Sequence, residues 1–320
     1  MTWSNITSPF PRYGTRRWLL SLLSSLVLIP SGMPPAEAQT TPPKLKVVTT
    51  FSILADLARN VGGDRAEVSS LVGPDGDVHV YAPTPSDVAA VKDARLLIVN
   101  GLGLEGWLPR LVQSSGGHAV TVVASDGITP RVISSGDKPR QHDGGSTDPH
   151  AWQAVTNAEI YVGNIRDAMT AADPANAVAY KANAAAYLTR LAALDDEVRR
   201  AIAKIPDAHR KVISAHNAFG YFADAYGVTF LASQGVSTDS EPSARDIAAI
   251  IRQIKADKIP AIFQENITDP RLIQQIASET GAKIGGKLYS DSLTGEHGEA
   301  PTYVGMIEHN LKAITGALAD

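Results

Sequence analysis

Three histidines and one aspartate stand just after predicted strands or in loops that open onto helices. His79 lies in DVHVYAPTPSD, His150 in DPHAW, His216 in SAHNAFGYF and Asp291 in LYSDSL. Three neutral imidazoles and one carboxylate make a complete four-coordinate ligand set for a divalent metal such as Zn²⁺. The four positions are far apart in the chain, so their spacing alone does not establish that they meet.

The remaining five histidines are expected to have no metal role: His118, His142, His209, His297 and His309. We place His118 and His209 in polar turns and His309 on an exposed helix face. His142 lies in a polar, glycine-rich loop at residues 134–148, where it could contact a metal ion transiently.

A second motif suggests different chemistry. Residues 101–106, GLGLEG, match the G-x-G-x-x-G pattern of dinucleotide-binding loops, and Asp126 follows twenty residues later. The pattern comes after the third predicted strand rather than the first, and Trp107 and Pro109 crowd the start of the helix. We therefore interpret these glycines as turn residues. The chain contains no H-E-x-x-H, G-x-S-x-G or Walker motif.

Hydrophobic periodicity predicts strands that alternate with helices on both sides of one long helix. Strands are expected at residues 45–51, 66–72, 95–100 and 119–124, and again at 211–215, 228–232, 261–264 and 283–288. We predict an α/β fold of two similar parallel-sheet lobes, residues 39–172 and 206–320, joined by one long rigid linker helix. Ligands of open α/β sheets bind at the carboxyl ends of the strands, which places the candidate residues in the cleft between the lobes.

The linker helix is the clearest element of the sequence, at residues 173–205. Asp173 is a suitable N-cap, Pro174 suits the first helical position and Pro206 ends the pattern. Apolar residues recur at intervals of three and four, as on one face of a helix. Because such a helix restricts the lobes to small tilts, we expect metal release to need local loop motion around His79, residues 134–148 and Asp291.

The N-terminus has the features of a cleaved signal peptide at residues 1–38. A basic region with Arg16 and Arg17 precedes a short apolar run at residues 18–29, and an A-x-A site ends at Ala38. The two arginines also fit a twin-arginine export signal, so both export routes stay open. We expect an exported protein that begins at Gln39.

Composition excludes several classes of function. The chain has 320 residues, 44% of them hydrophobic, and a net charge of −4 without a basic stripe, so no nucleic-acid partner is expected. It has no cysteine, which excludes disulfides, thiolate metal sites, a cysteine nucleophile and a lipid anchor on cysteine.

With these motifs in order around a long helix, the chain resembles the cluster A-I solute receptors of ABC transporters, which bind zinc or manganese. HVYAPTPSD resembles the first-ligand motif of that family, DPHAW the second, SAHNAFGYF the third and LYSDSL the fourth. The resemblance covers the chain from Leu45 onwards. It implies metal ligands at His79, His150, His216 and Asp291, with the first two from one lobe and the last two from the other.

The resemblance also implies a function, which is to capture a metal ion and deliver it to an ABC permease at the inner membrane. We expect a monomer that is not an enzyme. Many relatives are anchored to lipid through a cysteine that this chain lacks, so we expect it to be free in a periplasm. Manganese receptors of the family usually have glutamate at the third position, where this chain has His216, so we expect Zn²⁺ as the ligand. Manganese or iron remains the alternative, because some relatives with the same four ligand types are linked to these metals.

Two other classes of function stay open. A secreted zinc hydrolase would need an open coordination position and a general base, for which Glu105, Glu241 and Glu265 are candidates. A cell-surface adhesin or a metal buffer would need no transporter, but the missing anchor cysteine argues against the adhesin.

Overall fold

The computed structural model describes residues 43–133 and 147–319. Residues 43–320 form one compact unit. The predicted signal peptide and His142 lie outside the described residues. Within the described ranges, no helix is both long enough and apolar enough to cross a membrane.

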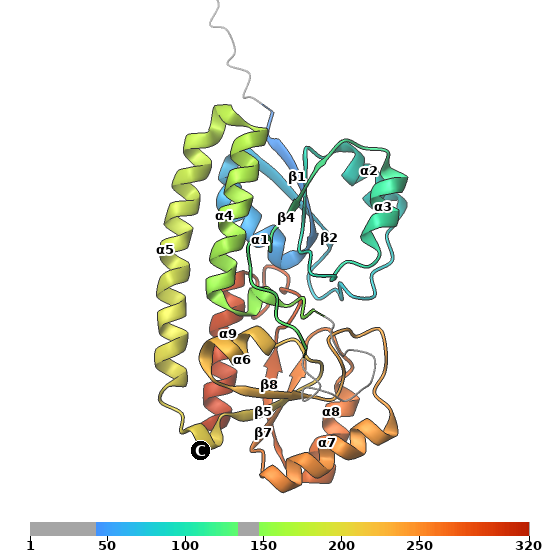
Figure 1. Cartoon of the computed structure of the whole chain (residues 1–320), viewed down its shortest axis with the longest axis vertical. Coiled ribbons are helices and arrows are strands. Elements are labelled where there is room, and N and C mark those ends of the chain that lie inside the picture. Colours follow the sequence, from blue (N-terminus) through green and yellow to red (C-terminus); the bar gives the residue numbers. More distant parts are fainter. Residues whose placement is uncertain (1–42, 134–146, 320) are drawn as a thin grey trace, which may run out of the picture. The chain divides into compact units, whose positions relative to one another are not determined.

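Two four-stranded parallel sheets organise the chain, as predicted (Figure 1). The first sheet has the order β2-β1-β3-β4, and the second has the corresponding order β6-β5-β7-β8. The strands of the first are β1 Leu45–Phe51, β2 Ala66–Val72, β3 Leu96–Val99 and β4 Val120–Val123. Those of the second are β5 Lys211–Ser214, β6 Thr229–Ala232, β7 Ala261–Glu265 and β8 Lys283–Leu288. The identical order means that both lobes place their strand ends in the same topological arrangement.

Helices follow most strands and cover the sheets, as expected when parallel strands are buried on both faces. In the first lobe they are α1 Ser52–Gly62, α2 Pro85–Asp93, α3 Leu108–Ser115 and α4 Val155–Ala172. In the second they are α6 Gly220–Tyr226, α7 Ala244–Asp257, α8 Pro270–Thr280 and α9 Tyr303–Leu318.

The long helix α5, Ala177–Ile202, is shorter at both ends than the predicted range. Pro174–Asn176 form a separate 3₁₀ turn before it. The Asp173 carboxylate accepts hydrogen bonds from the side chains of Asn176 and Tyr180 instead of capping backbone N–H groups. The predicted apolar face is correct, because Tyr180, Leu191 and Val198 are fully buried.

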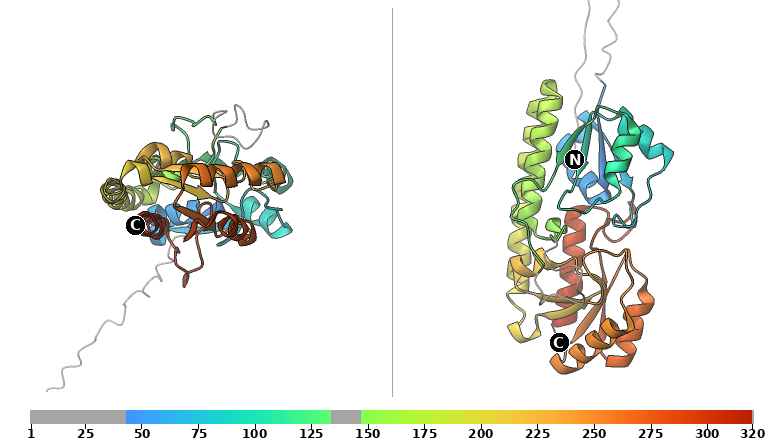
Figure 2. Two further views of the ribbon diagram at one scale, coloured as in Figure 1. Left: turned by 90° about the horizontal axis from the view of Figure 1, so that it is seen from below. Right: turned by 45° about the vertical axis from the view of Figure 1, so that its right-hand side comes forward.

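Helix α5 packs along α4 and α1 and also contacts α6 and α9 of the second lobe. The last helix, α9, likewise reaches both lobes. It packs on β8 and runs beside α5 (Figure 2), and the backbone N–H of Tyr303 at its start donates to the Asp56 carboxylate on α1. Helix α9 of the second lobe therefore also contacts the first lobe, in addition to the predicted linker helix. The division at residues 172 and 206 stays a prediction.

The main apolar core is continuous between the lobes. One cluster of buried side chains includes residues from α1, α4, α5, α6, α9 and both sheets. Two smaller clusters lie under the outer helices, one beneath α7 and α8 and one beneath α2 and α3. Because the large cluster is shared, the inner parts of the two lobes are packed together as one body.

The buried face of α5 gives a stability prediction. Leu191 is completely buried, so Leu191→Ala should lower the free energy of unfolding by about 2–5 kcal/mol through lost burial and a cavity. Val178→Ala on the same helix is the control, because Val178 is 83% exposed and should change stability by less than about 0.5 kcal/mol. Urea unfolding of the two variants measures both values, and equal effects would contradict the packing described.

Candidate metal centre

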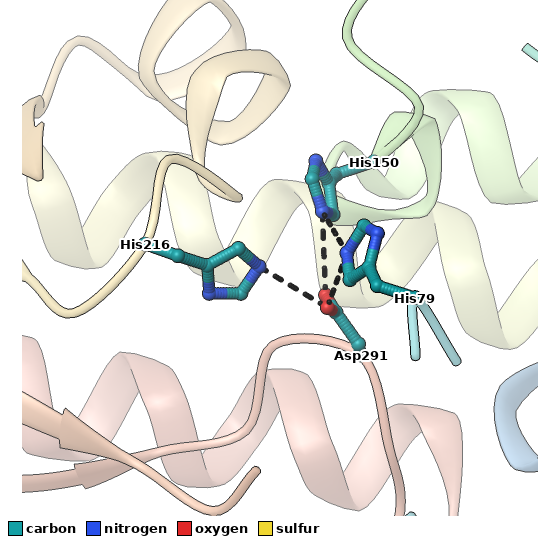
Figure 3. A group of neighbouring side chains, drawn as sticks. All are labelled: His79, His150, His216 and Asp291. Carbon is teal, nitrogen blue, oxygen red and sulfur yellow. Dashed lines mark hydrogen bonds and ion pairs between the residues drawn. The ribbon is translucent and has the colours of Figure 1, made fainter. Parts of the chain in front are cut away.

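The four residues singled out in the sequence meet at one point between the lobes (Figure 3). His79, His150, His216 and Asp291 each offer one ligand atom, and these atoms all lie within 4.8 Å of one another. The Asp291 carboxylate is at the centre of the group. Its Oδ2 lies 3.1 Å from His79 Nε2 and 3.1 Å from His216 Nε2, and its Oδ1 lies 3.6 Å from His150 Nε2.

The group is almost fully removed from solvent. His150 and His216 are 0% exposed and Asp291 is 1% exposed. The His79 side chain is 4% exposed, although its backbone borders the surface. Charges in such a place interact strongly because little water screens them, and they need a partner of opposite sign.

All four side chains come from segments that follow strands. His79 lies in the loop between β2 and α2, and His150 lies in the segment that leads from β4 to α4. His216 follows the end of β5 by two positions, and Asp291 follows the end of β8 by three. Because the strands of each sheet are parallel, their carboxyl ends share one edge, and these two edges face each other across the site.

Carboxylates behind two of the histidines fix the orientation of their rings. Asp148 Oδ1 accepts a hydrogen bond from the backbone N–H of His150 and lies 2.8 Å from Nδ1 of the same histidine. Glu265 does the same for His216, with Oε2 2.5 Å from Nδ1 and Oε1 bound to the backbone N–H. A proton on each Nδ1 leaves the Nε2 lone pair directed at the site, as a metal ligand requires.

These carboxylates were not assigned this role from the sequence. Glu265 was considered only as a possible general base, and its contact with His216 leaves it no such position. A local signal existed for Asp148, because His79 and His150 are each preceded by aspartate two positions earlier. Asp77 Oδ1 accepts the backbone N–H of His79 at 2.9 Å, in the same way as Asp148 does for His150. Glu265 has no such signal, because 49 positions separate it from His216.

Electrostatics in the site favour a positive charge beside Asp291. Burial opposes the charged form of His216, but Glu265 and Asp291 outweigh it and raise the pKa of His216 well above 6.5. Burial would likewise raise the pKa of Asp291, but His216 and His150 lower it well below 3.8. In the metal-free protein both shifts favour a charged His216 ring beside an ionised Asp291 carboxylate.

His150 and Asp291 are connected through their neighbours, although they belong to different lobes. The indole Nε1 of Trp152 and the amide Nε2 of Gln153 both donate to the backbone carbonyl of Ser290, at 2.8 and 2.6 Å. The Trp152 ring also packs edge-on against the His150 ring. One ligand from each lobe is therefore held in a common hydrogen-bond network.

The glycine-rich stretch at residues 101–106 is a turn closed by its own glutamate. The Glu105 carboxylate accepts hydrogen bonds from the backbone N–H groups of Asn100 and Gly101 and from the Thr50 hydroxyl. Gly101 and Gly103 have φ angles of 83° and 84°, which glycine adopts without strain. These donors face a buried carboxylate, so the interpretation as turn glycines fits the structure.

Of the other described histidines, His118, His209 and His297 are exposed and lie apart from the site. His309 differs from the prediction of an exposed helix face. It is half-buried, its Nε2 lies 3.0 Å from the Lys287 carbonyl, and its ring packs edge-on against Tyr289.

Comparison with known proteins agrees with this geometry. A family model described as "Zinc-uptake complex component A periplasmic" matches residues 47–317. The chain belongs to this family. Its members are substrate-binding receptors of ABC transporters that bind metal ions and deliver them to a permease, and they are not enzymes.

Individual members of the family differ in the metal that their names give. The iron-binding protein YfeA of Yersinia pestis is 35% identical over 309 residues, 97% of each chain. The manganese-binding lipoprotein MntA of Halalkalibacterium halodurans is 34% identical over 275 residues, 86% of this chain and 89% of its own. The periplasmic zinc-binding protein TroA of Treponema pallidum has 31% identity and a TM-score of 0.79, covering 87% of this chain and all of its own.

The contact between Glu265 and His216 gives a prediction for the metal-free protein. Glu265→Gln removes one of the two negative charges that raise the pKa of His216, so this pKa should fall while the fold is kept. NMR of the imidazole nuclei across a pH titration measures it. Asp269→Asn, a change on the exposed cap of α8, is the control and should leave the His216 titration unchanged. An unaltered His216 titration in Glu265→Gln would contradict the assigned role of this carboxylate.

Proposed function

We propose that this chain is an extracytoplasmic receptor that captures Zn²⁺ with His79, His150, His216 and Asp291 and delivers it to an ABC permease. The observation that carries the proposal is the donor set: three imidazole Nε2 atoms and a carboxylate, buried together between two lobes. Four such donors match the tetrahedral coordination that Zn²⁺ prefers. We further propose that the chain acts as a monomer in a periplasm after export.

The nature of the donors supports zinc over manganese. Three imidazoles and one carboxylate form a nitrogen-rich, singly anionic set, and affinity at such sites rises from Mn²⁺ through Fe²⁺ to Zn²⁺. The carboxylates of Asp148 and Glu265 increase the donor strength of His150 and His216 without binding the ion themselves.

One observation favours the alternative of manganese or iron. Asp291 has both oxygens in the site, Oδ2 beside His79 and His216 and Oδ1 beside His150. Oδ1 is buried and has no hydrogen-bond partner among the described residues. A bidentate carboxylate would raise the coordination number to five, which Mn²⁺ and Fe²⁺ accept readily.

The capture mechanism follows from the charges in the site. Asp291 provides the negative charge that attracts a cation, and the three histidines must be neutral to donate their lone pairs. The ion takes the place of the proton on His216 as the partner of Asp291. The buried site excludes water, so the ion is held by protein ligands alone until the surrounding chain moves.

A metal titration tests the ligand assignment. Zn²⁺ should raise the melting temperature more than Mn²⁺ or Fe²⁺ at equal concentration, because binding to the native state stabilises it by about 2.7 kcal/mol at 100 times the dissociation constant. His216→Ala should lose most of the zinc-induced shift, and His118→Ala, a change to an exposed histidine, should keep it. A full shift in His216→Ala would refute the four-ligand site, and a larger shift with Mn²⁺ or Fe²⁺ would replace zinc by that metal.

Proton release gives a second test. The raised pKa of His216 favours its protonated form in the empty site, so binding should release about one proton per ion and affinity should fall as pH is lowered. The folding stability of the metal-free protein should depend on pH in the opposite direction. The stability that protonated His216 contributes is present below pH 6.5 and is lost as pH rises through the raised pKa. Calorimetry in buffers of different ionisation enthalpy counts the protons. Metal binding at pH 7 without proton release would contradict the assigned charge of His216.

A further inference from the structure

The ligand atoms are too deeply buried for an ion to reach them directly. His150 and His216 are 0% exposed, and the side chain of His79 is 4% exposed. Some part of the surrounding chain must therefore move whenever an ion enters or leaves. The hydrogen bonds around each ligand indicate which part this is.

Three of the ligands are held by several buried contacts. Both His150 and His216 are bound through backbone and ring to a buried carboxylate. Asp291 lies between two tethered neighbours, because the Ser290 carbonyl accepts from two side chains and the backbone N–H of Leu293 donates to the Ser52 hydroxyl. Moving any of these segments would break several buried hydrogen bonds at once.

Residues 233–243, the segment between β6 and α7, run beside His216, because the backbone N–H of Gln234 donates to the Ala215 carbonyl and that of Asn217 donates to the Gly235 carbonyl. We call this segment the strap. A cavity of about 480 Å³ lies beside it and is lined in part by Asp77, Ala215, Thr238 and Glu241. We call this the side cavity. Ala215 is next to His216 in the chain and Asp77 is two positions before His79, so the side cavity is lined by sequence neighbours of two ligands.

The strap is joined to the first lobe by a hydrogen bond from the Thr238 hydroxyl to Asp77 Oδ2, at 2.5 Å. The other oxygen of Asp77 accepts the backbone N–H of His79. Asp77 therefore connects the strap to a ligand-bearing loop of the other lobe. The contact is only partly buried, so breaking it and hydrating both groups costs less than breaking the contacts behind His150 and His216.

We propose that the hydrogen bond between Thr238 and Asp77 is the closing contact of a gate, and that metal ions exchange through the side cavity when the strap separates from Asp77. This inference rests on the proposed function as a metal receptor. The side cavity is large enough for the purpose, because an ion with six waters occupies on the order of 200 Å³ at about 30 Å³ per water. Asp77 and Glu241 give the lining carboxylates that attract a cation, whereas the charge of Asp269 there is paired with Arg271.

A gate and a merely structural contact have different kinetic consequences. If the hydrogen bond closes a gate, its loss makes opening more frequent and accelerates entry and release by the same factor, so the equilibrium affinity changes little. If Thr238 only helps Asp77 to position His79, its loss weakens the bound state, and release accelerates while entry does not.

The test compares three variants of the full mature chain with the unmodified protein. Thr238→Val replaces the hydroxyl by a methyl group of similar size, and Thr238→Ser keeps a hydroxyl. Ser237→Ala is the matched control, because its hydroxyl accepts from Asp239 N–H within the strap. Stopped-flow measurements follow Zn²⁺ uptake, and release into excess chelator, in each variant.

Thr238→Val should accelerate both uptake and release about tenfold, which corresponds to about 1.4 kcal/mol, with less than a threefold change in dissociation constant. Thr238→Ser and Ser237→Ala should stay within about threefold of the unmodified protein in both rates. Any other pattern overturns the gate, including unchanged rates in Thr238→Val or faster release with unaltered uptake.

Hydrogen exchange of the metal-free protein provides a readout that needs no bound ion. Backbone amides of the strap should exchange about tenfold faster in Thr238→Val than in Ser237→Ala, and equal exchange would overturn the inference. If the unmodified protein binds none of Zn²⁺, Mn²⁺ and Fe²⁺, the proposed function fails instead, and the strap exchange still reports whether Thr238 holds the strap closed.

Discussion

The carboxylate of Asp291 is a negative charge in a place that water does not reach, and the surrounding structure is arranged to compensate it. An isolated buried charge is very costly, so a partner of opposite sign must be present whether or not an ion is bound. The nitrogens of His79 and His216 lie 3.1 Å from it, and the raised pKa of His216 favours the charged form of that ring beside the carboxylate.

The same constraint explains the buried carboxylates behind the histidines and the connections between the lobes. Asp148 and Glu265 hold two rings in the orientation that serves Asp291, and the donors from Trp152 and Gln153 fix the backbone beside it. The continuous apolar core and the contacts of α5 and α9 with both lobes hold these residues in fixed positions relative to one another. Exchange is then left to segments at the edge of the site, where fewer contacts must be broken.

Much of this was accessible from the sequence because the decisive patterns are local. Short apolar runs in the sequence predict the strands, and β1, β2 and β8 have the predicted bounds. The four candidate ligands were identified from their residue types, their position after strands and the family motifs. The start of α5 was misplaced because side-chain hydrogen bonds at Asp173, rather than helix propensity, determine where the helix begins. Glu265 was missed as a partner of His216 because only the fold brings β7 beside β5. The contact of α9 with α1 was not predicted for the same reason, since it joins Tyr303 to Asp56.

The order of the ligands along the chain has a consequence for biogenesis. The centre is built from positions 79, 150, 216 and 291 of 320 residues, and α9, which binds both lobes, comes last. Any N-terminal fragment that stops before position 291 lacks the central carboxylate, however well its first lobe has folded. Contacts between such distant residues also form late, because closing long loops is slow. A chain whose synthesis has not yet passed position 291 therefore cannot assemble the complete candidate centre.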